Sequence, residues 1–180
     1  MESNNTKAPM LKPALNYGAI LGIALVIYQT ILYFAHLATN NFMGMLSYLI
    51  VIAGIYLAAR KFRDDFCSGS ITYGRALGFS TLTIIFASFI LAVFTYIQYT
   101  IIDPGLIERI LEIAEENMIN QGMPEEQIDI AMTWAEKFTT PGVLTFNVFF
   151  GMVLIGVLIS LITSIFVKKG SNSALNTGNY

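Results

Sequence analysis

Three long stretches of this chain carry no Lys, Arg, Asp or Glu, and they restrict the fold more than any other feature of the sequence. They cover residues 13–59, 76–102 and 138–167. A bilayer core about 30 Å thick needs roughly 20 apolar residues in a helix. The first stretch is therefore long enough for two membrane spans, and each of the others is long enough for one.

The composition agrees with this interpretation. The chain is 55% hydrophobic and only 12% charged, and its mean hydropathy is +0.63, whereas a globular chain carries about 25% charged residues. The alternative is a soluble all-α protein with several fully buried helices. Helices of soluble proteins need a polar face, and these stretches have none. We therefore predict an all-α polytopic membrane protein with four transmembrane helices.

The domain boundaries follow from the same pattern. The turn-like segment HLATNN, residues 36–41, separates the two spans of the first stretch. The predicted organisation is a cytoplasmic N-terminal segment at 1–13, a single membrane domain at 14–169 with spans near 14–35, 42–59, 76–102 and 143–167, and a disordered cytoplasmic tail at 170–180. The first apolar region is too long for a signal peptide, so we expect it to stay attached.

The basic residues predict the orientation. Eight of the ten Lys and Arg residues precede the first span, lie between the second and third spans, or follow the fourth, and only Arg109 and Lys137 fall on the other side. Short loops rich in Lys and Arg remain in the cytoplasm. We therefore predict that both termini are cytoplasmic.

The segment at 103–142 contrasts with its apolar neighbours, since it holds nine of the twelve acidic residues. It is not a fifth span, because each carboxylate at the bilayer centre costs about 2.5–3.5 kcal/mol. Asp103 is predicted to cap a first helix with Pro104 at its first position, Gly122 to end it, and Pro124 to start a second helix.

Each of these two helices carries an apolar stripe at helical spacing. The stripes are Ile107, Leu111, Ala114 and Met118 in the first helix, and Ile128, Ala131, Met132, Ala135 and Phe138 in the second. We expect an extracytoplasmic hairpin that buries one stripe against the other. The alternative is that both helices lie on the membrane surface, but such helices normally have a basic polar face. Ile130, Trp134 and Phe138 are the predicted contacts with a partner.

Two similar hexapeptides, YGAILG and YGRALG, open the first and third spans. Their glycine pairs, Gly18 with Gly22 and Gly74 with Gly78, allow close approach of helix backbones. One hypothesis is a duplicated two-span hairpin in which spans one and three cross at these glycines. The other is chance similarity within a restricted membrane alphabet. Gly156 and Ser160 form a further small-residue step, so all six residues are helix-packing candidates.

No catalytic, cofactor-binding or metal-binding pattern is present in the sequence. One His and one Cys are too few for a His/Cys zinc site, and no glycine-rich phosphate loop or calcium loop occurs. We therefore expect no cofactor, no metal and no nucleic-acid partner. The groups within the spans that could line a polar path are Gln29, Gln98, Thr30, Thr83 and Ser88. Glutamines within spans, such as Gln29 and Gln98, more often form hydrogen bonds between helices than bind a solute.

Three motifs resemble one family of bacterial membrane proteins, the domain of unknown function 4199 family, found mainly in Bacteroidota. They are LNYGAILGI at the first span, ITYGRALGF at the third with YTIIDPGLIERILE after it, and QGMPEEQIDIAMTWAEKF in the acidic segment. The likeness covers about residues 12–169. It implies four spans in the inner membrane and no assigned activity.

The first functional hypothesis is a non-enzymatic protein whose acidic hairpin associates with a second copy or with another envelope protein. The second is a small transporter or channel subunit, which needs a polar path through the spans. The third, a lipid-modifying enzyme, requires Asp103 and His36 to meet at the outer surface. Apart from the bilayer itself, the sequence names no partner.

Overall fold

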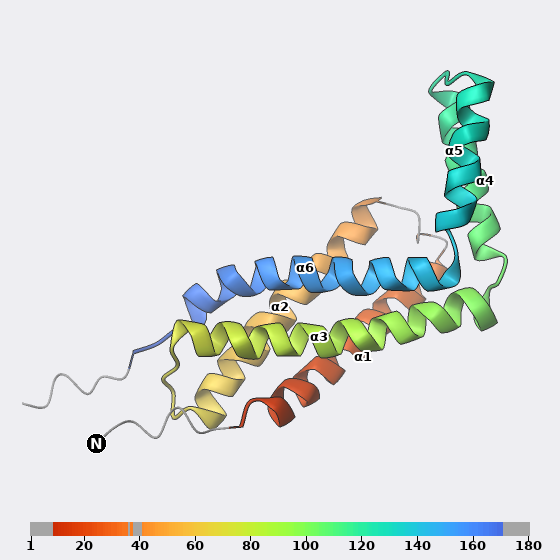
Figure 1. Cartoon of the computed structure of the whole chain (residues 1–180). Coiled ribbons are helices and arrows are strands. Elements are labelled where there is room, and N and C mark those ends of the chain that lie inside the picture. The colour runs from red at the N-terminus through yellow and green to blue at the C-terminus, as the bar shows by residue number, and fades with distance from the viewer. Residues whose placement is uncertain (1–8, 36, 38–40, 171–180) are drawn as a thin grey trace, which may run out of the picture. The chain divides into compact units, whose positions relative to one another are not determined.

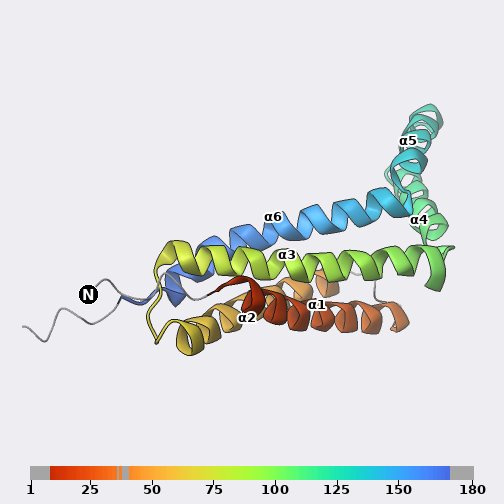
Figure 2. The ribbon, with the colours of Figure 1, turned by 60° about the horizontal axis from the view of Figure 1, so that its bottom comes forward.

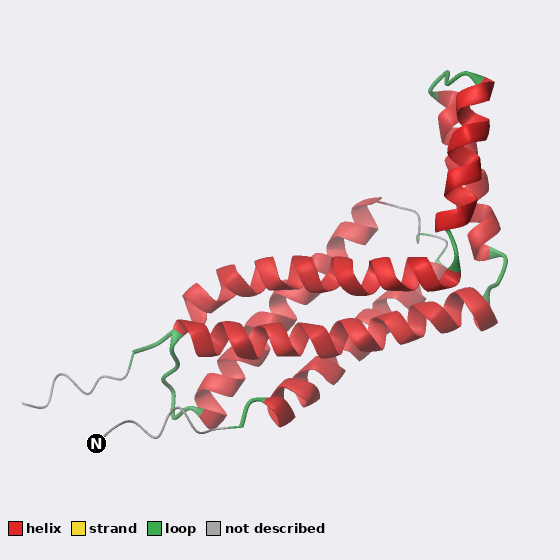
Figure 3. Cartoon of the chain, in the orientation of Figure 1, coloured by secondary structure: helices red, strands yellow, loops and turns green. Residues whose placement is uncertain are grey.

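The structure is a computed structural model that describes residues 9–35, 37 and 41–170; most of the predicted tail, and His36, lie outside these residues. The chain forms six α-helices and one π-helical turn in the described part (Figure 1). They are α1 (Leu11–Phe34), α2 (Asn41–Phe66), α3 (Tyr73–Ile97), the π-helix η2 (Gln98–Ile102), α4 (Leu106–Asn120), α5 (Glu125–Phe138) and α6 (Pro141–Val167). Figure 3 shows only helices and loops there, so the all-α prediction is confirmed.

Four of the helical segments are long and apolar enough to cross a membrane. They are Leu11–Phe34, Phe42–Phe66, Tyr73–Ile102 and Pro141–Val167, which confirms the prediction of four spans. Large apolar side chains cover the outward faces of these helices. On α6, for example, Leu154, Leu158 and Ile162 follow one another at a spacing of four residues, and all three side chains are exposed. An apolar surface of this extent is unfavourable in contact with water, and the acyl chains of a bilayer shield it from water.

The second span does not end where the loss of apolar residues suggests. Instead of stopping at Ala59, α2 continues to Phe66. Arg60 lies 3.9 Å from Asp64 at i,i+4 spacing, and an Nη of Arg63 donates to the carbonyl of Val167 at the end of α6. These contacts extend the helix by two turns beyond its apolar part.

The helix beginnings also differ by a few residues from the sequence prediction. Helix α1 begins at Leu11, before the predicted boundary at 14, and takes Pro13 into its first turn, where a missing N–H costs nothing. Helix α4 begins at Leu106 rather than at Pro104, and Asp103 is not its N-cap. The carboxylate of Asp103 instead forms an ion pair with Arg109.

By contacts within the chain, the structure divides into two compact units. The first contains Met1–Ile90 and Gly151–Tyr180, and the second contains Leu91–Phe150. The first unit therefore holds α1, α2, most of α3 and most of α6. The second holds the end of α3, η2, α4, α5 and the start of α6.

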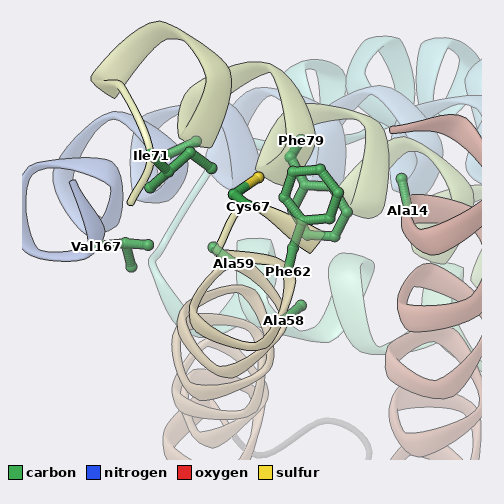
Figure 4. Packing of buried hydrophobic residues seen from close by; sticks show 9 residues of the cluster. Ala14, Ala58, Ala59, Phe62, Cys67, Ile71, Phe79 and Val167 are labelled. Carbon is green, nitrogen blue, oxygen red and sulfur yellow. The ribbon is translucent and has the colours of Figure 1, made fainter. Parts of the chain in front are cut away.

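The core of the first unit lies where α2 leaves its apolar part (Figure 4). The rings of Phe62 and Phe79 stack with their centroids 4.0 Å apart and their planes 4° from parallel. Cys67 lies beside this pair in Figure 4, and Ala59, Ile71 and Val167 belong to the same buried cluster. Aromatic stacking of this kind adds about 0.5–1.5 kcal/mol to the burial of the rings, so the core fixes α2 against α3.

Backbone pairing fastens the same end of the first unit. The N–H of Ile71 donates to the carbonyl of Lys169 at 3.0 Å, and the N–H of Lys169 returns the bond at 3.1 Å. The hydroxyl of Tyr73 donates to the carbonyl of Leu161 at 3.2 Å. We call this part of the first unit the basic end, since it carries Lys12, Arg60, Lys61, Arg63, Arg75, Lys168 and Lys169.

In the second unit, α4 and α5 pack side by side (Figures 1 and 2). Gly122, with φ of +73°, ends α4, and Pro124 precedes the first residue of α5. A positive φ is easy for glycine and costly for other residues, which explains why the turn falls there. Before α4, Pro104 keeps Asp103 out of the helical region, and the backbone of Asp103, at φ −147° and ψ 77°, ends the helical run of η2.

Candidate functional site

The candidate partner-contact residues lie on one face of α5. Ile130, Trp134 and Phe138 follow one another at i,i+4 spacing and are 56%, 56% and 59% exposed. Residues at this spacing are neighbours on a helix surface. We call these three residues the exposed row.

The exposed row is separate from the face with which α5 packs on α4. Ile128 is only 8% exposed, and Ala131, Met132 and Ala135 are half-buried. Phe138, which the sequence pattern also places on the buried stripe, does not lie there, because α5 ends at this residue and leaves its ring outside the helix pair. The packing of α4 on α5 therefore does not use the exposed row.

Side-chain contacts give the exposed row a defined shape. The rings of Trp134 and Phe138 stack with centroids 6.0 Å apart and an interplanar angle of 15°. The ammonium of Lys137 lies 5.1 Å from the Trp134 ring centroid, which is cation–π geometry. Two aromatic rings held together in this way offer a large rigid surface with little rotamer entropy to lose on binding.

Acidic groups dominate the surroundings of the exposed row. Residues 103–142 contain nine Asp and Glu and two Lys and Arg, so their formal charge is 2 − 9 = −7. On α5 itself, Glu126, Asp129 and Glu136 are exposed. A partner with basic residues around an apolar pocket would match this surface.

Three of the six helix-packing candidates lie in close helix contacts. A Cβ on Gly18 would stand 2.7 Å from the Thr83 carbonyl oxygen, one on Gly22 would stand 3.1 Å from the Ala87 carbonyl oxygen, and one on Gly156 would meet the Ile84 side chain. The first two glycines therefore let α1 approach the backbone of α3, and the third lets α6 approach α3.

The other packing candidates behave differently. Gly74 and Gly78 have no heavy atom within 4 Å of where a Cβ would stand. The glycines of α1 therefore contact the middle of α3. The hypothesis that spans one and three cross at both glycine pairs is wrong, because Gly18 and Gly22 do not face Gly74 and Gly78. Ser160 is fully buried, and its hydroxyl donates to the carbonyl of Gly156 at 2.7 Å.

Buried hydroxyl groups follow the inner faces of α3 and α6 in the first unit. Ser80, Ser88 and Ser164 are fully buried, and their hydroxyl oxygens have no hydrogen-bond partner among the described residues. Thr83 is also buried, and its hydroxyl donates to the carbonyl of Phe79 at 2.9 Å. The sequence marked Ser88 and Thr83 as polar and placed Ser164 on a small-residue step with Gly156 and Ser160, but it gave no indication that Ser80 shares this interior.

The described residues bring no metal-binding cluster together. None of them form a cluster of three His, Cys, Asp or Glu side chains. Asp103, the acid that an enzymatic hypothesis requires, is ion-paired with Arg109. Cys67 is 1% exposed, and its burial raises the pKa of its thiol.

Four apolar helices of membrane-crossing length, with an acidic helix pair between the third and the fourth, define the chain as an all-α multi-pass membrane protein. The family described as "Protein of unknown function (DUF4199)" matches residues 16–169. The chain belongs to this family. No curated protein and no solved structure matches the chain.

Proposed function

We propose that this protein is a non-enzymatic docking protein of the bacterial inner membrane. In this proposal, the four spans anchor the chain with both termini in the cytoplasm, and α4 and α5 stand on the periplasmic side. The exposed row of α5 binds another protein of the cell envelope. The observation that carries the proposal is the exposure of Ile130, Trp134 and Phe138 on a helix whose own packing uses a different face.

The chemistry of the row favours a protein partner. Trp is among the residues that most often dominate binding energy at protein interfaces, and here Trp134 stacks on Phe138. An anionic membrane surface would be repelled by the acidic residues of α5, as would a second copy carrying the same charge of −7 over residues 103–142. We therefore assign the row to a different protein, with an apolar pocket and a basic rim.

Site-specific crosslinking in native membranes tests this proposal. A photo-reactive phenylalanine analogue in place of Trp134 is expected to form an adduct with one discrete protein. Ile130→Ser is expected to weaken that adduct by about tenfold or more, because truncating a central apolar contact at an interface costs about 2 kcal/mol. High salt should weaken it further.

The matched control places the same analogue at Glu116, which is exposed on α4 away from the row, and should yield no such adduct. Adducts with lipid, adducts of twice the mass of the chain, or a protein adduct insensitive to both Ile130→Ser and salt would each contradict the proposal.

The buried hydroxyls support a second candidate function, that of a transporter or channel subunit. The hydroxyl oxygens of Ser80, Ser88 and Ser164 have no hydrogen-bond partner among the described residues, and an unsatisfied buried polar group costs about 1–3 kcal/mol. A solute or water file would satisfy them. Ser88→Ala and Gln29→Leu should then reduce solute flux in reconstituted vesicles, and unchanged flux in both would exclude this role.

A further inference from the structure

A cavity of about 470 Å³ lies between α1 and α2 in the first unit. Helix α1 contributes Tyr17, Ile20, Leu21 and Ala24 to its lining, and α2 contributes side chains from Ile50 to Lys61. The volume falls within the range of about 300–1,000 Å³ that is usual for ligand pockets. None of these residues belongs to the exposed row or to the buried hydroxyls.

The cavity is a groove on the outward surface of the spans. Ile20 and Leu57, which line it, are both more than half exposed. Its floor is formed where Gly54 faces Leu21, since a Cβ on Gly54 would stand 2.5 Å from a methyl group of Leu21. The absence of a side chain at Gly54 therefore lets Leu21 of α1 pack directly against α2 at the floor of the groove.

Polar groups occur at only one end of the groove. The Lys61 side chain is exposed and lines the groove at the basic end, and Tyr17 lines the same end from α1. The Tyr17 ring is held edge-on against Phe79, with centroids 6.2 Å apart. Every other lining residue is apolar. The groove thus has a cationic mouth and a hydrocarbon interior.

The depth of the groove matches one leaflet of a bilayer. The groove follows twelve residues of α2, from Ile50 to Lys61, and the eleven rises between them span about 16 Å at 1.5 Å per residue. Half of a hydrocarbon core of about 30 Å is about 15 Å. A molecule with its polar group at Lys61 therefore reaches Ile50 near the middle of the membrane.

We propose that this groove is a binding site for one anionic phospholipid. An acyl chain occupies the apolar channel between α1 and α2, and the lipid phosphate accepts hydrogen bonds from the Lys61 ammonium and the Tyr17 hydroxyl. Charge complementarity at Lys61 selects the anionic headgroup, and the depth selects a full acyl chain over a short apolar solute. This site does not depend on any partner of α5.

Native mass spectrometry of the purified full-length chain tests the site. Phosphatidylglycerol, added to the protein in detergent, is expected to give a one-lipid adduct, and phosphatidylcholine is expected to bind at least about fivefold more weakly. Lys61→Gln should weaken phosphatidylglycerol binding about fivefold, since one Lys near an anionic headgroup contributes about this factor. Lys61→Arg should restore it. Lys168→Gln, which removes an exposed charge of the basic end outside the groove, should leave it unchanged.

A second variant separates the acyl-chain site from the charge. Ala53 is exposed and lines the groove, so Ala53→Phe fills the channel without disturbing the Phe62–Phe79 core. It is expected to abolish the one-lipid adduct while circular dichroism and the unfolding temperature stay unchanged. Equal binding of the two lipids, adduct formation unaffected by both Lys61→Gln and Ala53→Phe, or a protein dimer lost on Ala53→Phe would each overturn the proposal.

Discussion

Gly18 is a position where one added methyl group meets atoms that have no freedom to move aside. A Cβ there would stand 2.7 Å from the Thr83 carbonyl oxygen and 2.7 Å from the Phe86 Cβ. Overpacking costs about 1–3 kcal/mol, more than the roughly 0.5–1 kcal/mol that alanine adds in a helix. We expect Gly18→Ala to lower the unfolding temperature in detergent, measured by circular dichroism. Gly74→Ala, with no atom within 4 Å, should leave it unchanged or raise it. If both variants lost stability, the close contact of Gly18 with α3 would not explain the effect of the substitution.

Cys67 makes a second prediction at the scale of one residue. Burial raises the pKa of its thiol above the usual value of about 9.0, and Arg75 opposes this shift more weakly. Since only the thiolate reacts, a small maleimide should modify Cys67 slowly at neutral pH and rapidly after denaturation. The control is Cys67→Ser combined with Ser68→Cys, which places the thiol on an exposed neighbour.

The same shift in pKa gives a stability change with a definite sign. A raised pKa means that the folded state binds the thiol proton more tightly than the unfolded state. The contribution of Cys67 to stability is therefore complete below about pH 9.0 and falls as the pH rises further. Relative to Cys67→Ser, the wild type should lose stability above that pH. A constant difference between the two proteins across this range would contradict the assignment.

At the scale of helices, α5 depends on one buried side chain. Ile128 is 8% exposed against α4, whereas Ile130 is 56% exposed. Ile128→Ala should destabilise the helix pair by about 2–4 kcal/mol, and amide hydrogen exchange should speed up across α4 and α5. Ile130→Ala, the matched control two residues away, should leave exchange unchanged. Equal amide protection in Ile128→Ala and Ile130→Ala would show that the stability of α4 and α5 does not depend on the contact at Ile128.

The sequence predicted the existence of these helices better than their ends. The charge-free stretches identified all four spans by their length, and apolar periodicity identified both stripes of the acidic segment, because burial follows the helical repeat. The sequence pattern did not predict helix ends that depend on contacts between residues far apart in the chain. Helix α2 passes Ala59 because Arg63 reaches the Val167 carbonyl, which is 104 residues away in the sequence. The π-helix Gln98–Ile102 had no signal in the apolar pattern at all.

At the scale of the whole chain, the sequence predicted the exposed row but not the groove between α1 and α2. Ile130 and Trp134 stood out because they fall off the apolar stripe of a short amphipathic helix. The groove needs Gly54 of α2 to face Leu21 of α1, and no local pattern reports which residues of two uniformly apolar helices meet. A helix that is apolar all round has no face that the sequence distinguishes from the others. Which faces of α1 and α2 contact each other is therefore known only from the packing in the structure.

The orientation of the chain in the membrane is the last prediction. Basic residues in short loops keep those loops in the cytoplasm, and the basic end holds most of the Lys and Arg. In a Cys67→Ser background, a membrane-impermeant maleimide added to intact spheroplasts should label Gln127→Cys on α5. It should not label Lys168→Cys until the membrane is opened. The reverse pattern would place α5 in the cytoplasm, where no periplasmic partner could reach the exposed row. Labelling of both sites in intact spheroplasts would contradict a membrane crossing between α5 and the end of α6.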